Sequence, residues 1–311
     1  MVLQRYDQLY RKSSKTLNGI PPWKLFTFTF WGSPIGWQKF MAPQEPWSYN
    51  PLGGEWNLVP YQMPDNQFYL GYHLSECQNI SYIAPSERKD QVLILANRSA
   101  SFHRPYNMLD ISRWPSIVKG IAGELINLSE NEDGYPIPKG LVGLGPQDRE
   151  AYSLLLRDSK ASLGIGHPQL STGPYASLCH GVPVILPFKS RRCPAHPPST
   201  DWCGFTGNLN LHQHGAIAST LSEPFVYMVD VEERKDDLVA TIWRAMKTPI
   251  EPIVFPEMTV EALTRRVEDY FHIDWKELAA RRMLDRGWNE VVTQEFMYAW
   301  LEKHPVTPQI P

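Results

Sequence analysis

The chain has 311 residues, a formal net charge of −3 and a charged fraction of 20%. A chain of this length can bury one large hydrophobic core or two smaller ones, and its charge gives no reason to expect a nucleic acid as a partner. No apolar run reaches the roughly 18 residues that a membrane span needs, and residues 1–19 lack the continuous apolar stretch of a signal peptide.

The N-terminal part of the chain contains few periodic segments. A strand with alternating aromatic residues is expected within 23–34, and residues 35–90 are irregular and rich in aromatic residues and proline. The segment 91–99 is expected to be a buried strand, and 111–129 has the pattern of a helix with Pro115 near its start. The 11 tryptophans and 28 prolines suit a surface that binds carbohydrate or peptide, although large enzymes rich in loops share this composition.

From residue 148 onward, predicted helices and strands alternate. Asp148 is expected to cap a helix over 149–160, and a helix over 173–181 ends at a glycine. The remaining elements are strands at 161–166, 182–188 and 225–231, a helix at 232–248 and a helical region from about 259 to the end. This alternation predicts an α/β fold with a Rossmann-like parallel sheet. We divide the chain into an irregular segment (1–90), a Rossmann-like domain (91–270) and a helical extension (271–311).

The stretch 164–188, GIGHPQLSTGPYASLCHGVPVILPF, contains a glycine-rich loop between a strand and a short helix. In a parallel sheet such a loop lies at the carboxyl end of its strand, where ligands bind, and the N-terminus of a helix favours a phosphate or diphosphate. Pro174 suits the first helical position. The residues expected to contact phosphate groups are Gly166, His167, Ser171, Thr172, Gly173, Pro174 and Lys189. A turn that needs small residues only for packing explains the glycines equally well.

Other chemistries receive less support. The glycine spacing differs from the dinucleotide fingerprint, and the chain has no phosphate-binding G-x-x-x-x-G-K-S/T motif. A zinc site is not predicted, because its potential ligands show no paired C-x-x-C spacing. These potential ligands are Cys193, His196, Cys203, His212 and His214. The absence of a D-x-D triplet also argues against a metal ion held by carboxylates.

The cysteines and the glycosylation motifs bear on the compartment. Cys193 and Cys203 flank a polar loop and are able to pair, whereas Cys179 is expected to be a buried thiol. Three Asn-x-Ser sequons occur, at Asn79, Asn97 and Asn127, and they are a weak indication of a lumenal protein.

Three stretches, read together, resemble one enzyme family. They are 53–72, 141–188 and 223–270. The matching residues, in order, are Trp56-Asn-Leu58, Pro64-Asp-Asn66, Leu155-Leu-Arg157 with Lys160, Gly164-Ile-Gly166 with Pro168 and Gly173-Pro174, Val229-Asp230, and Ile250 with Pro252. Over roughly residues 23–270 the chain resembles the alpha-1,6-mannosylglycoprotein 6-beta-N-acetylglucosaminyltransferases, which form glycosyltransferase family 18.

This resemblance implies the C-terminal, donor-binding half of a two-domain GT-B glycosyltransferase of the Golgi. Such an enzyme transfers N-acetylglucosamine (GlcNAc) from UDP-GlcNAc, without a metal ion, in beta-1,6 linkage to the alpha-1,6-mannose of N-glycans. The resemblance places Trp56 near the acceptor sugar. It places the catalytic base in a further N-terminal domain, so no catalytic residue is named here.

Two alternatives stay open. Leu170 and Ser177 stand where the family carries acidic residues, which favours a relative that binds nucleotide sugar or glycan without turnover. The second alternative is another enzyme of similar fold that uses nucleotide sugars or phosphates and takes His167 as its acid or base.

Overall fold

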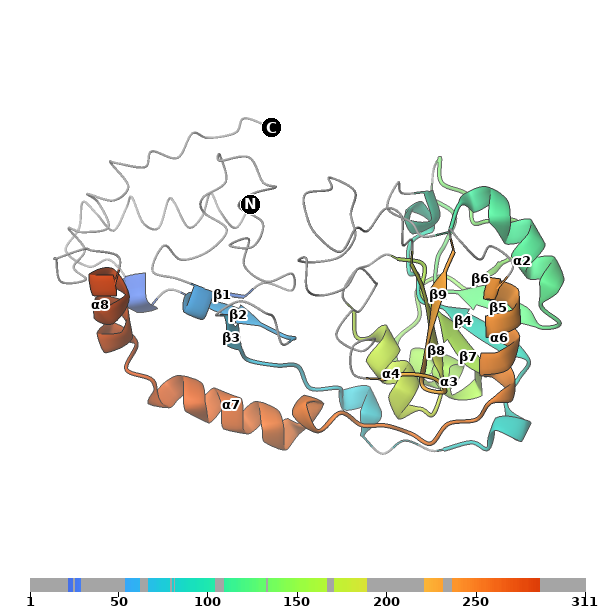
Figure 1. Ribbon diagram of the computed structural model, residues 1–311. Helices are drawn as coiled ribbons and strands as arrows, with labels where there is room; N and C mark the ends of the chain where they lie inside the picture. Colours follow the sequence, from blue (N-terminus) through green and yellow to red (C-terminus); the bar gives the residue numbers. More distant parts are fainter. Residues whose placement is uncertain are drawn as a thin grey trace. The chain divides into compact units, whose positions relative to one another are not determined.

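The computed structural model describes residues 22–24, 26–28, 54–61, 67–78, 80, 82–103, 109–132, 134–166, 171–188, 221–231 and 237–285. The chain divides into two compact units (Figure 1). One unit lies within His73–Thr259, and the other lies within Met1–Tyr72 and Val260–Pro311.

A six-stranded parallel sheet forms the centre of the His73–Thr259 unit. Its strands are β4 (Gln91–Ile94), β5 (Glu124–Asn127), β6 (Val142–Gly143), β7 (Ala161–Leu163), β8 (Val184–Phe188) and β9 (Val226–Asp230). Their spatial order, β6-β5-β4-β7-β8-β9, is the 3-2-1-4-5-6 order of doubly wound nucleotide-binding folds. All neighbouring strands are parallel. The predicted α/β fold with a Rossmann-like parallel sheet is therefore confirmed.

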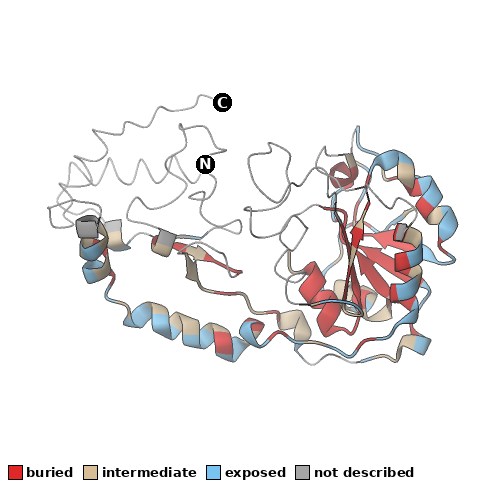
Figure 2. Ribbon diagram, in the orientation of Figure 1, coloured by how far each residue is buried: buried red, intermediate tan, exposed pale blue. Residues whose placement is uncertain are grey.

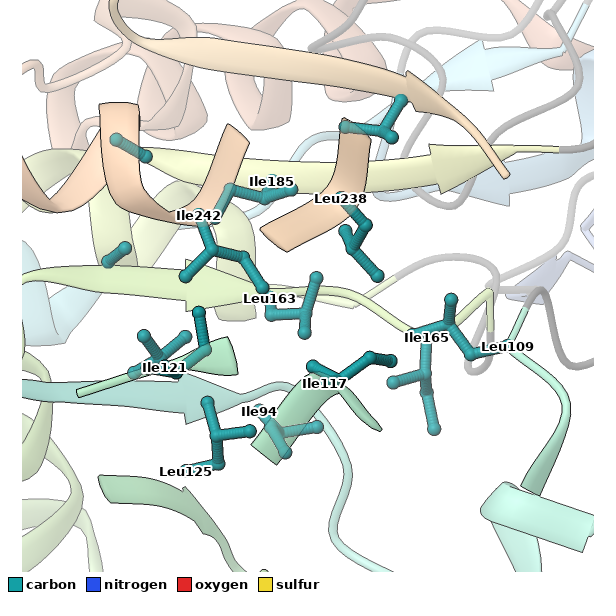
Figure 3. Close-up of a cluster of buried hydrophobic side chains, with 14 of the residues drawn as sticks. Ile94, Leu109, Ile117, Ile121, Leu125, Leu163, Ile165, Ile185, Leu238 and Ile242 are labelled. Carbon is teal, nitrogen blue, oxygen red and sulfur yellow. The ribbon is translucent and has the colours of Figure 1, made fainter. Parts of the chain in front are cut away.

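Helices cover both faces of this sheet (Figure 1). They are α2 (Trp114–Gly120) and α6 (Asp237–Lys247) on one face, and α3 (Arg149–Asp158) and α4 (Gly173–Cys179) on the other. Successive side chains of a strand point to opposite faces, so Ile94 packs with Ile117 of α2 (Figure 3), whereas Leu93 packs with Leu156 of α3. The strands are buried between the two helical layers, and the outer faces of α2 and α6 are exposed (Figure 2).

Several helix ends follow the predicted local signals. The carboxylate of Asp148 accepts a hydrogen bond of 2.8 Å from the Ala151 backbone N–H, which makes it the predicted N-cap of α3. The chain turns after α4 at Gly181, whose φ of +69° lies in the left-handed region that glycine enters without steric cost.

The predicted helix over 111–129 is only half right. Helix α2 ends at Gly120, and the chain then enters β5. At Gly123 a side chain is excluded, since a Cβ would lie 2.3 Å from the Asp90 carbonyl oxygen. The Glu124 N–H donates to that same oxygen at 2.8 Å, so the close backbone approach begins the pairing of β5 with β4.

The second unit contains a small parallel sheet and two helices. These elements are β1 (Thr27–Phe28), β2 (Asn57–Val59), β3 (Phe68–Tyr69), α7 (Val260–His272) and α8 (Trp275–Asp285). Aromatic rings join them, with Phe26 and Phe68 each meeting Tyr270 and Trp275 edge to face. Short 3-10 helices complete the two units: η1 (Pro22–Lys24), η3 (Gly54–Trp56), η4 (Ser75–Cys77), η5 (Pro85–Glu87), η6 (Ser99–His103), η7 (Ile111–Arg113) and η8 (Pro256–Met258).

The unit boundaries differ from the predicted divisions after residues 90 and 270. Residues 73–90 lie in the unit of the large sheet, where a disulfide from Cys77 and hydrogen bonds from Arg88 attach them. Helix α7 lies in the other unit, because the Arg266 guanidinium donates to the Leu70 carbonyl at 2.8 Å and covers the Tyr69 ring. Both attachments join segments distant in sequence, which local composition does not reveal. In the described part of the chain, no helix has the length and apolar character needed to span a membrane.

Arg88 is a buried hub of the large unit. Its guanidinium donates to the backbone carbonyls of Ile83, His180 and Gly181 at 2.8–3.2 Å. The side chain is 5% exposed, and burial lowers the pKa of the guanidinium. Arg88 thereby joins the segment before β4 to the turn that follows α4.

Replacing Arg88 by methionine is expected to lower the free energy of unfolding by roughly 3 kcal/mol, because it leaves several buried carbonyls without donors. Chemical denaturation measures the change. Lys89→Met is the matched control, since the Lys89 side chain is 65% exposed and pairs with Asp158 at 3.2 Å. It is expected to cost no more than about 0.5 kcal/mol. Equal effects of the two substitutions would contradict the hub role of Arg88.

Candidate functional site

The strand order reverses direction between β4 and β7, which makes the carboxyl edge of these two strands a topological switch point. Strands β4 and β7 are neighbours, but the chain leaves β4 toward α2 on one face and leaves β7 toward α4 on the other. The two connections therefore diverge, and in doubly wound folds ligands bind at this point of divergence. The predicted loop after β7 lies at this switch point. The sequence did not indicate that the connection after β4 lies on the other side of this switch point.

On the α4 side, the backbone is closely packed around Gly173. Gly166 has a φ of +92°, and Gly173 is buried. A Cβ at Gly173 would lie 3.3 Å from both the Leu95 side chain and the Tyr152 hydroxyl oxygen. The Gly173 N–H donates to the Ser171 hydroxyl at 3.3 Å. The small residue at 173 thus fits a tightly packed position at the start of α4.

Helix α4 begins at Gly173, so Pro174 is its second residue rather than the predicted first, and Thr172 is the N-cap residue without a capping bond from its side chain. The Ala176 N–H donates to the Thr172 carbonyl at 2.9 Å. The hydroxyl of Ser177 donates to the Gly173 carbonyl at 2.9 Å and is fully buried. The Ser177 hydroxyl therefore makes its hydrogen bond within α4. Ser177 stands at the position where the family that this chain resembles is expected to carry an acidic residue.

On the β4 side, a carboxylate holds the connection in place. Glu132 accepts hydrogen bonds from the Ala100 N–H at 2.7 Å and from the Arg98 guanidinium at 2.9 Å. The Ser99 hydroxyl accepts from the Glu132 N–H at 3.0 Å. The Ala100 N–H, followed by Arg98, holds the pKa of Glu132 below its usual value. These hydrogen bonds to the ionised Glu132 carboxylate hold η6 in place, while Asn97 and Arg98 stay exposed at the edge of the sheet.

Five of the predicted phosphate-contacting residues lie among the described residues: Gly166, Ser171, Thr172, Gly173 and Pro174. His167 and Lys189 lie outside the described residues, as do the potential zinc ligands from Cys193 to His214. Among the described residues, no group of three or more His, Cys, Asp or Glu side chains is placed to bind a metal ion. Asn97 and Arg98 were not predicted, and only the strand order identifies them as neighbours of the loop.

Trp56 lies in the other unit and is fully buried there. Its indole N–H donates to the Trp23 carbonyl at 3.1 Å, and its ring meets Trp275 edge to face at 5.5 Å between centroids. A sugar could reach this ring only if neighbouring side chains moved. The acceptor role of Trp56 remains a prediction.

A disulfide joins Cys77 of η4 to Cys179 at the end of α4. The expectation that Cys179 is a buried thiol is therefore wrong. The two cysteines are 102 residues apart, and the fold alone brings their Cα atoms within 5.7 Å. Cys193 and Cys203, which we considered as a pair, lie outside the described residues.

His180 follows Cys179 and is buried. Its Nδ1 lies 2.8 Å from the Ala176 carbonyl oxygen, and its Nε2 lies 2.8 Å from the Ser153 hydroxyl. A neutral imidazole satisfies both contacts, with Nδ1–H donating and Nε2 accepting. Burial lowers the pKa of His180 below its ordinary value of 6.5. This histidine supports the packing of α4 on α3.

His180 predicts a pH dependence of stability. Because its pKa is lower in the folded state, the unfolded chain binds more protons below pH 6.5, and stability is lost as the pH falls through that range. His180→Gln is expected to show a smaller loss of unfolding free energy between pH 7 and pH 5 than the parent, as measured by denaturant titration. His272→Gln, at an exposed residue, is the control and is expected to follow the parent. Identical curves for His180→Gln and the parent would refute the prediction.

Curated relatives match most of the chain, although no family model matches it. It is 26% identical over 252 residues to the alpha-1,6-mannosylglycoprotein 6-beta-N-acetylglucosaminyltransferases A of Cricetulus griseus and Homo sapiens, covering 73% of this chain and 32% of each relative. The human B enzyme is 24% identical over 235 residues, covering 71% and 28%. The chain thus spans about a third of the length of the curated relatives that it matches.

Solved structures give weaker matches. A UDP-GlcNAc 2-epimerase from Methanocaldococcus jannaschii is 14% identical, with a TM-score of 0.33 over 61% of this chain and 47% of that one. The glycosyltransferase of kitacinnamycin is also 14% identical, with a TM-score of 0.37 over 89% of this chain and 73% of that one. Such TM-scores are too low to support a conclusion. The sequence similarity does confirm the resemblance predicted from the motifs: this chain is similar in sequence to the alpha-1,6-mannosylglycoprotein 6-beta-N-acetylglucosaminyltransferases.

Proposed function

We propose that this chain is the donor-binding part of a glycosyltransferase that transfers GlcNAc from UDP-GlcNAc to the alpha-1,6-mannose of N-glycans in beta-1,6 linkage. The observation that carries the proposal is the similarity to the named transferases over 73% of the chain. The doubly wound sheet supports it, because the glycine-rich loop lies at the switch point where such folds bind nucleotides.

The diphosphate of the donor would lie between the connections that follow β4 and β7. The glycines of the loop would allow its backbone to approach, the Ser171 and Thr172 hydroxyls would donate to phosphate oxygens, and Lys189 would supply a positive charge for the leaving UDP. The proposal needs no metal ion. The catalytic base would come from the part of the protein that corresponds to the remaining length of the relatives.

A compartment follows from the same proposal. We place the protein in the secretory pathway, in the Golgi lumen. The Cys77–Cys179 disulfide supports this placement, because such bonds form and persist in oxidising compartments.

A second candidate is a relative that holds nucleotide sugar or glycan without turnover. Ser177 favours it, since the hydroxyl that replaces the acidic residue of the family is enclosed in α4 and donates to Gly173. A ribose held by a carboxylate at this position in the family would lose that partner here.

Calorimetric titration with UDP and UDP-GlcNAc tests the donor site. We expect binding that is independent of magnesium, and at least a tenfold loss in Gly173→Asp, because a side chain there would crowd Leu95 and the Tyr152 hydroxyl and shift the backbone at the start of α4. Gly134→Asp is the matched control. Its φ of +77° is one that aspartate adopts more readily than most residues, and a Cβ there meets open space.

Thermal unfolding should show that both variants are folded before their affinities are compared. If the parent binds neither ligand at millimolar concentration, the donor site is refuted. Binding of an N-glycan without any binding of UDP would instead support the second candidate.

A further inference from the structure

Two of the three sequons lie among the described residues, and the structure places them in opposite surroundings. Asn97-Arg98-Ser99 follows the end of β4, and Asn127-Leu128-Ser129 begins at the last residue of β5. Asn79 lies outside the described residues. A sequon is used in a folded protein only where its asparagine lies at the surface.

Asn97 lies at the surface. Both Asn97 and Arg98 are exposed, and no hydrogen bond joins the Asn97 side chain to another described residue. The third residue of the motif is held inward, with the Ser99 hydroxyl 3.3 Å from the Glu132 carboxylate. The bend therefore presents the asparagine amide to solvent, while the serine anchors the turn beneath it.

Asn127 is enclosed. Its side chain is 0% exposed, its Nδ2 donates to the Val142 carbonyl at 3.2 Å, and its Oδ1 accepts from the Ser129 N–H at 2.9 Å. A sugar on this nitrogen would occupy the space where β6 pairs with β5. A chain modified at Asn127 would therefore be unable to complete the sheet.

We propose that Asn97 is an N-glycosylation site and that Asn127 stays unmodified in the folded protein. The donor is an oligosaccharide linked to a lipid diphosphate. A bond forms between Nδ2 of Asn97 and the anomeric carbon of the first sugar, and the bond from that carbon to the diphosphate oxygen breaks. The lipid diphosphate leaves with the electron pair, and the amide nitrogen loses one proton to a base of the transferring enzyme.

The inference rests on the proposed location in the secretory pathway, and it has a consequence for the donor site. Asn97 follows β4 at the switch point, beside the connection that leaves β7. A glycan attached there would lie at the same edge of the sheet as the proposed donor site.

The test uses the whole chain behind a cleavable secretory leader and a spacer with one additional sequon, produced in insect cells and purified from the medium. Release of glycans by peptide N-glycosidase F in ¹⁸O-water converts each occupied asparagine to labelled aspartate, and mass spectrometry then gives the occupancy of each site. We expect Asn97 to be labelled in most molecules and Asn127 in none.

Two variants complete the test. Asn97→Gln is expected to lose one glycan from the secreted protein. Ser129→Ala removes the sequon of Asn127 and is expected to leave the glycan mass unchanged. It is structurally mild, because the buried Ser129 hydroxyl has no hydrogen-bond partner among the described residues.

An unlabelled Asn97 in molecules whose spacer sequon is occupied would overturn the proposal, and so would labelled Asn127 in folded, secreted protein. The leader guarantees passage through the secretory pathway. The result is therefore independent of the UDP titration, which uses unglycosylated protein.

Discussion

The parallel pairing of β4 with both β5 and β7 is the constraint on which the large unit depends. In this register Val92 lies opposite Leu125 on one side and Ala161 on the other. All four residues of β4 are buried. Because β4 is central, the chain must leave it in one direction and leave β7 in the other. The helices on the two faces and the switch point at the carboxyl edge follow from that single reversal.

Helix α4 depends on a second set of long-range contacts. The Cys77–Cys179 disulfide, the Arg88 guanidinium and the buried His180 all hold the C-terminal end of this seven-residue helix. A short helix has little stability of its own, so tertiary contacts must determine its position. They place its N-terminal end at the switch point. A loop that contacts phosphate groups would gain from such a fixed helix, because the donors would not need to be ordered on binding.

The two described sequons show that the same local sequence pattern can be either exposed or buried, depending on its tertiary surroundings. Both consist of an asparagine, one intervening residue and a serine at the end of a strand. Asn127 pairs with the neighbouring strand β6, whereas Asn97 lies beyond the end of β4 and is exposed. The sheet therefore encloses one amide and presents the other to solvent.

The alternation of helices and strands after Asp148, the cap of α3 and the stop at Gly181 could all be predicted from the sequence, because each depends on neighbouring residues. The glycine-rich loop and the family resemblance were also visible there. Strand β5 was missed because its short apolar run, directly after a helix, has no distinguishing period. The strand order, the Cys77–Cys179 pair and the neighbourhood of Asn97 were decided by the tertiary structure alone. They join residues tens to a hundred positions apart, and local periodicity carries no information about such contacts.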